Sequence, residues 1–124
     1  MFKRLFIAVL FAAIASGASA QAQKKGVNGG DVVTVEGHPI EFVSKGPDIA
    51  FYIIDDDGTT PVQTKGLRGR AVIQDGGKTT TVNLSAAEPN KFVGKLQAPL
   101  GSKARVVFSA RVEGHNLQAR FTSN

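Results

Sequence analysis

The sequence predicts an all-β domain: a two-sheet antiparallel sandwich of immunoglobulin type, with seven to eight strands. Two observations favour this fold class. From Asp31 onward, short runs of alternating apolar and polar residues are separated by turn residues at intervals of about ten. After residue 20, no window keeps the period of about 3.6 residues that an amphipathic helix requires. Many short strands in one domain suit a sandwich, and a small closed β-barrel is the alternative architecture.

The expected strands follow one another along the chain. They cover residues 31–35, 39–44, 48–54, 69–75, 78–84, 91–97, 103–113 and 116–122. The run IAFYII at 49–54 is apolar on both faces, which indicates a central strand. Asp75-Gly76-Gly77 predicts a hairpin between the next two strands. Four of the five prolines fall between runs, where a missing N–H does not interrupt a ladder; these are Pro47, Pro61, Pro89 and Pro99.

The last two strands give the clearest register. A two-residue turn at Gly114-His115 pairs Val112 with Leu117. The same register pairs Phe108 with Phe121, so that apolar side chains meet apolar ones. We therefore expect Phe108 and Phe121 to be buried cross-strand neighbours.

The N-terminal residues have the features of an export signal. Lys3 and Arg4 precede the apolar run LFIAVLFAAI, and Ala18-Ser19-Ala20 matches an A-x-A cleavage signal. The run is shorter than the roughly 20 residues that span a bilayer. We expect residues 1–20 to be a cleaved signal peptide, with a periplasmic destination and no membrane span in the mature chain. The polar, Gly-rich stretch 21–30 predicts a flexible leader, and residues 31–124 form the β-sandwich domain.

The composition excludes several kinds of site. The chain has no Cys, and its only methionine is Met1, so neither a disulfide nor a soft Cu(I) site is expected. No serine lies in a G-x-S-x-G pattern, and GGKT at 76–79 lacks the upstream glycine of a P-loop. After removal of residues 1–20, 13 basic residues face 10 acidic ones, a net charge of +3 that is too small to indicate nucleic-acid binding. We predict that the protein is not an enzyme.

The tetrapeptide VEGH occurs at 35–38 and 112–115 and contains both histidines. If every connection reverses the chain, both copies and the loop at 55–67 lie at one end of the domain. Imidazoles and carboxylates there make a ligand set for Zn(II) or Cu(II). The candidate metal ligands are therefore His38, His115, Asp55 and Asp57.

A turn without any metal is the competing interpretation of VEGH. Gly-X suits a type II′ hairpin, which would explain Gly114-His115. The first turn is expected to be wider, because Pro39 has no N–H to close a two-residue loop. If both VEGH copies are only turns, the chain holds no cofactor. The DDDG sequence at 55–58 lacks the spacing of a calcium-binding EF-hand loop and indicates an Asx turn.

A basic surface is expected on the outward face of the last hairpin. It contains Lys103, Arg105, Arg111 and Arg120. These residues form a candidate docking face for an acidic protein partner or for lipid headgroups. The alternative is protection of an edge strand, a common use of charge in β-sheets.

Several short segments resemble small exported β-sandwich proteins and domains that accompany heavy-metal efflux systems of Gram-negative bacteria. The segments are 52–58 (YIIDDDG), 76–78 (GGK), 81–84 (TVNL), 87–90 (AEPN), 94–96 (GKL) and 118–121 (QARF). They lie at turns and core positions, so the resemblance concerns the fold more than activity. It implies a non-enzymatic periplasmic accessory module that assists a metal-efflux or other envelope system. The alternative function is a direct Zn(II) or Cu(II) carrier that uses the two histidines.

Overall fold

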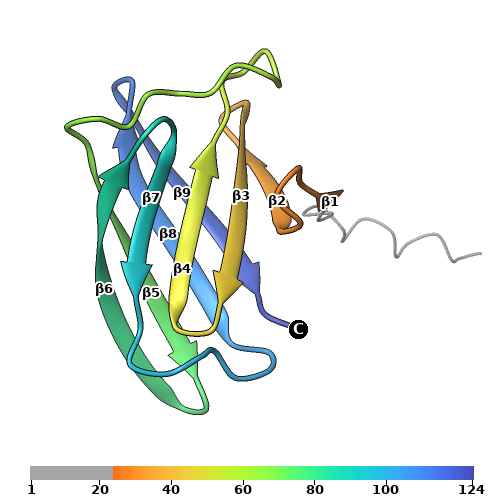
Figure 1. Cartoon of the computed structure of the whole chain (residues 1–124), viewed down its shortest axis with the longest axis vertical. Helices are drawn as coiled ribbons and strands as arrows, with labels where there is room; N and C mark the ends of the chain where they lie inside the picture. The colour runs from red at the N-terminus through yellow and green to blue at the C-terminus, as the bar shows by residue number, and fades with distance from the viewer. Residues whose placement is uncertain (1–23) are drawn as a thin grey trace, which may run out of the picture.

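The computed structural model describes residues 24–124, and these form one antiparallel sheet of nine strands (Figure 1). The strands are β1 (Lys24–Lys25), β2 (Asp31–Val35), β3 (His38–Lys45), β4 (Asp48–Ile53), β5 (Arg68–Asp75), β6 (Lys78–Ala87), β7 (Lys91–Lys95), β8 (Arg105–Val112) and β9 (His115–Thr122). Their order in the sheet is β1-β2-β3-β4-β7-β6-β5-β8-β9. The all-β prediction is confirmed. The predicted signal peptide at 1–20 lies outside the described residues.

The sheet is continuous and curled, so two separate sheets are not confirmed. The front half contains β3, β4 and β7, and β8 and β9 lie behind it (Figure 1). The long strand β6 joins the halves: it pairs with β5 along its length and, at Ser85–Ala87, with β7. At the other side of the curl, β2 approaches β9. Apolar alternation determines which face of a strand is buried, but the lateral hydrogen-bond partners of β6 depend on where that strand bends.

Five phenylalanines fill the interior of the curl. Phe42, Phe51 and Phe92 lie opposite one another across β3, β4 and β7. Phe51 stacks on Phe108 of β8 with ring centroids 4.6 Å apart. Phe42 contacts Phe121 of β9 at 5.3 Å. All five are buried. The rings therefore join the two facing halves of the sheet, and the offset and tilted geometries are those that aromatic pairs prefer.

Both VEGH copies form the same two-residue hairpin, with Glu and Gly at the turn. Glu36 and Gly37 have φ of 52° and 81°, and Glu113 and Gly114 have φ of 52° and 80°. Positive φ at both central residues defines a type I′ turn. The predicted type II′ turn at Gly114-His115 is therefore wrong. The predicted register of the last two strands is wrong by two residues.

The corrected register pairs Val112 with His115, Val106 with Phe121 and Phe108 with Ala119. The shift of two residues preserves the inward and outward faces, because side chains alternate with a period of two. Phe108 and Phe121 are therefore both buried as expected, but they are not directly opposite each other.

The first turn is as tight as the second, although Pro39 follows it. Val35 pairs with His38, and Thr34 pairs with Pro39. The carbonyl oxygen of Pro39 accepts a hydrogen bond from the Ile54 amide, so the polar backbone groups of Pro39 face β4 and not β2. The missing N–H of proline therefore removes no bond from the β2–β3 hairpin, and the expected wider turn is not needed.

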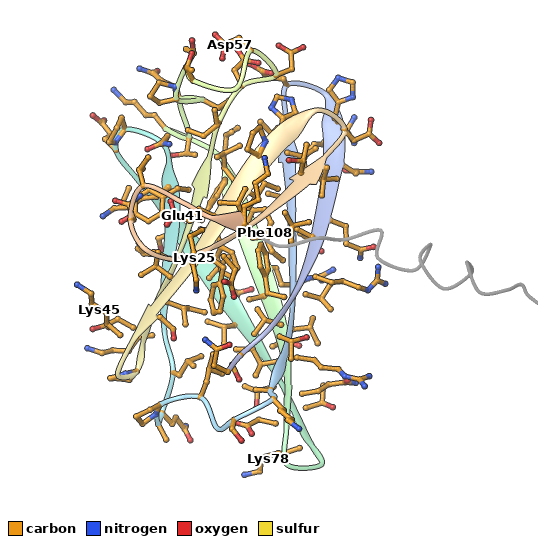
Figure 2. The ribbon with its side chains drawn as sticks, turned by 90° about the vertical axis from the view of Figure 1, so that its right-hand side faces the viewer. Lys25, Glu41, Lys45, Asp57, Lys78 and Phe108 are labelled. Carbon is orange, nitrogen blue, oxygen red and sulfur yellow. The ribbon has the colours of Figure 1, made fainter. Side chains whose placement is uncertain are left out.

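Glu41 holds residues 26–30 against the outer surface of β3. Its buried carboxylate accepts hydrogen bonds from the Gly30 amide at 2.7 Å and from the backbone and side-chain N–H groups of Asn28. A side chain at Gly26 would collide with this carboxylate, since a Cβ there would lie 2.3 Å from Cδ of Glu41. Part of the segment that the sequence assigns to a leader is thus fixed to the domain (Figure 2).

Truncating Phe108 tests the packing across the curl. We expect Phe108→Ala to lower the free energy of unfolding by about 3–5 kcal/mol, because it removes a ring that touches both Phe51 and Phe92. Chemical denaturation followed by circular dichroism measures the loss. Val107→Ala is the control, since Val107 is half-buried on the other face of the same strand. Equal stability of the two variants would contradict the proposed core.

A second prediction concerns Glu41. Glu41→Gln places an amide group against N–H donors. We expect the free energy of unfolding to fall by about 1.5–3 kcal/mol, the usual contribution of hydrogen bonds to a charged group. Amide hydrogen exchange at residues 26–30 should accelerate. Glu36→Gln, which changes an exposed turn carboxylate, is the matched control. Unchanged exchange at Gly30 in Glu41→Gln would refute the role assigned to this carboxylate.

Candidate metal centre

Three connections meet at one end of the curled sheet, the upper end in Figure 1. They are the β2–β3 turn, the loop after β4 and the β8–β9 turn, which supply His38, Asp55 and Glu113. One ligand atom from each of these residues lies within 4.8 Å of the other two. Gly37 also lies close to the loop, because a Cβ there would be 3.3 Å from Cβ of Asp56. The prediction that these connections share one end of the domain is confirmed.

His38 is buried, and its ring has one fixed orientation. Nδ1 lies 3.0 Å from the carbonyl oxygen of Ile54. A carbonyl oxygen only accepts hydrogen bonds, so Nδ1 carries the proton and donates it. Nε2 faces Glu113, whose Oε1 is 3.7 Å away. Metal-binding histidines in proteins are commonly held in this way, by a hydrogen bond from the second ring nitrogen to a carbonyl.

Asp55 and Glu113 add two carboxylates near the ring of His38, and Glu113 is the one that faces Nε2. Asp55 is half-buried, and Glu113 is exposed in the β8–β9 turn. Ligand atoms on a tetrahedral Zn(II) ion, each about 2.1 Å from the metal, lie about 3.4 Å apart. The three candidate atoms lie within 4.8 Å of one another, so binding requires these side chains to close by up to about 1.4 Å. Glu113 is exposed and can take part in this movement. With neutral His38 the ligand set has two negative charges, which match a divalent cation.

Two of the four predicted metal ligands lie in this group, and two do not. His38 and Asp55 belong to it. His115 is exposed on β9, an edge strand of the sheet. The carboxylate of Asp57 points into its own loop and accepts hydrogen bonds from Thr59 and Thr60. The label at the top of Figure 2 marks the position of Asp57.

Glu113 was not predicted as a ligand. The sequence does contain a signal for it, since Glu precedes Gly in both VEGH copies and each Glu lies at a turn. Only the curl of the sheet brings the second Glu to the first His. Spacing along the chain could not show that the β8–β9 turn comes close to β3.

The Asp57 carboxylate orders the loop after β4. The hydroxyl of Thr60 donates to Asp57 Oδ2, and the amides of Thr59 and Thr60 donate to Oδ1, each at 2.8 Å. These bonds, above all the one from the Thr60 side chain, lower the pKa of Asp57 from 3.8 to about 2. The Asx-turn interpretation of DDDG is consistent with this geometry.

The predicted docking residues are all exposed. Arg105 and Arg111 lie on β8, and Arg120 lies on β9. Lys103 lies in the turn before β8 with φ of 61°. Arg111 donates a hydrogen bond of 3.2 Å to the side-chain oxygen of Asn116 on β9.

Comparison with known protein families, curated proteins and solved structures finds no match to this chain. Within residues 24–124, no helix has the length and apolar character needed to cross a membrane. The assignment of a function therefore depends on the geometry of the chain itself.

The low pKa of Asp57 predicts the pH dependence of its loop. The charged carboxylate accepts the Thr59 and Thr60 amides fully above about pH 3.8, and this ordering is lost as the pH falls through about 2. NMR titration of the two amide resonances should give a midpoint near pH 2. Asp57→Asn should abolish the transition. A midpoint near the ordinary Asp value, about 3.9, would show that the hydrogen bonds do not form in solution.

Proposed function

We propose that this protein is a non-enzymatic binding module that holds one Zn(II) or Cu(II) ion between His38, Asp55 and Glu113. A single observation carries the proposal. His38 is buried, its Nδ1–H is held by the Ile54 carbonyl, and its Nε2 faces a carboxylate from a hairpin that is distant in sequence.

The donor set favours these two metals. Imidazole nitrogen suits Zn(II) and Cu(II), whereas Ca(II) and Mg(II) prefer oxygen ligands alone. Three protein ligands leave the fourth tetrahedral position of Zn(II) to water or to a further ligand. An ion bound in this way can be exchanged with a partner, which suits a carrier better than a closed structural site.

The wider biological role rests on the sequence. The N-terminal pattern supports export to the periplasm, and the segments described above resemble modules that accompany heavy-metal efflux systems. We propose that the module assists such an envelope system through a protein partner. The facing halves of the sheet and their shared phenylalanine core support its interpretation as an immunoglobulin-like sandwich with one continuous bridging strand, β6.

The structure also offers a purely mechanical interpretation of the same residues. Protonated His38 and Glu113 at 3.7 Å can form an ion pair that fastens the two VEGH hairpins to each other. In this case the protein is an accessory module without a metal. The two interpretations differ in whether the wild-type protein binds an added ion.

Calorimetric titration with ZnCl2 and with CuCl2 tests the proposal. We expect His38→Gln and Glu113→Gln each to weaken binding at least about tenfold, since each removes a ligand. Glu113 is exposed, so its substitution leaves the core intact. His115→Gln is the matched control and should bind as the wild type does, because His115 lies outside the group.

Two results would contradict the metal site. One is a loss of affinity in His115→Gln as large as that in His38→Gln. The other is wild-type binding no tighter than about 1 mM, which corresponds to only about 4 kcal/mol.

A further inference from the structure

All five arginines of residues 24–124 lie on one surface of the sheet. They are Arg68 and Arg70 on β5, Arg105 and Arg111 on β8, and Arg120 on β9. Each is exposed, and the residues that alternate with them, such as Ala71, Val106 and Ala119, are buried. We call this outer surface of β5, β8 and β9 the arginine face. Two of its members, Arg68 and Arg70, were not among the predicted docking residues.

Protection of an edge strand does not explain the arginine face. β5 and β8 are interior strands, because β6 and β9 lie outside them in the sheet. Four of the five arginines are on these interior strands, and only Arg120 is on the edge strand β9. A charge that prevents edge-to-edge pairing is needed only at an edge.

The charges on this face are not neutralised by the described part of the chain. The lysines elsewhere include two that form ion pairs, Lys25 with Asp31 and Lys95 with Asp48. Within residues 24–124, no arginine forms an ion pair, and no Asp or Glu lies on the outer surface of β5, β8 or β9. The strands β5, β8 and β9 thus carry arginine and no lysine.

Three of the arginines are neighbours around a shallow hollow. The β5–β8 ladder ends where Gly69 pairs with Ala110, so Arg68 and Arg111 both follow directly on this last pair. Arg70 pairs with Ser109 and is therefore diagonal to Arg111. Like charges that are neighbours across two strands destabilise a sheet. The same hollow is lined by Ser109, Asn116 and Gln118, whose polar groups can bind hydroxyls or oxyanions. An anion in this hollow would relieve the repulsion among the three guanidinium groups.

We propose that the arginine face binds a linear acidic polysaccharide. Guanidinium groups bind carboxylate and sulfate in pairs of parallel hydrogen bonds, and the intervening Ser, Thr, Asn and Gln residues match sugar hydroxyls. Arg105 and Arg111 are six positions apart on β8, so the charges extend over about 20 Å along the strands. That length suits several consecutive sugar units, and a single small anion could occupy only part of it.

Other classes of partner fit this surface less well. The hot spots of protein interfaces are enriched in Trp and Tyr as well as Arg, and the outward residues of these three strands include no aromatic residue. Insertion into a membrane surface requires an apolar side. The large apolar residue exposed in residues 24–124 is Val27, which precedes β2 and is not on the arginine face. This inference is independent of the metal centre.

Binding of a heparin octasaccharide, measured by calorimetry, tests the proposal. We expect Arg70→Gln/Arg111→Gln to lower the affinity at least about tenfold, because charge-assisted hydrogen bonds at the centre of the hollow are lost. The matched control, Lys45→Gln/Lys78→Gln, removes the same charge from other parts of the surface (Figure 2) and should bind nearly as the wild type does. A neutral maltooligosaccharide of equal length should not bind.

The thermal stability of the variants supplies a second measurement. Arg70→Gln/Arg111→Gln should melt at the same temperature as the wild type or higher, since repulsion is removed, and this separates lost binding from lost folding. Equal affinity of the arginine and lysine variants for the octasaccharide would show that net charge alone governs binding, and would overturn the proposal. So would tighter binding to vesicles of phosphatidylglycerol and phosphatidylcholine, or to duplex DNA, than to the octasaccharide.

Discussion

Contact between phenylalanine rings across the curl is the interaction on which the rest of this structure depends. Phe51 of β4 stacks on Phe108 of β8, although β4 and β8 share no hydrogen bonds in the sheet. A nine-stranded sheet of this length would otherwise expose one apolar face to water. Folding that face onto itself buries it, and the chain has neither a disulfide nor a second domain among its described residues to supply the same closure. The closure also determines which loops can meet.

The candidate metal centre is a consequence of this closure. His38 and Asp55 come from the half of the sheet that contains β3 and β4, and Glu113 comes from the β8–β9 turn of the facing half. The curl is what brings Glu113 within 4.8 Å of the other two. The arginine face is the outer surface of the same layer whose inner surface carries Phe108 and Phe121. The inner side of β5, β8 and β9 therefore supplies the stability, and the outer side of these three strands carries the five arginines at some cost in repulsion.

The two VEGH copies show how position in the sheet changes the role of identical residues. Both form type I′ turns, and both histidines have the strand phase of buried residues. His38 begins β3, whose neighbour β4 continues to Ile54 and provides a carbonyl for the ring. His115 begins β9, which has β8 on one side only, and it stays exposed. The repeated sequence thus specifies a turn, and the environment decides which imidazole becomes a candidate ligand.

The sequence by itself determined the approximate positions of β2 to β9, the buried faces and the common end of the two VEGH turns, because these depend on alternation and on local turn chemistry. It did not predict β1, which lies in the segment expected to be a leader. It also indicated His38, Asp55 and three of the five arginines of the outer face. Only the tertiary structure decided the single curled sheet, the hairpin register, the place of Glu113 beside His38 and the role of Glu41 in holding residues 26–30. The curl and the place of Glu113 depend on contacts between segments distant in the chain, and the hairpin register depends on which two residues form the turn. A period of two residues cannot encode them, since it is unchanged when a strand slips by two or exchanges its lateral partner.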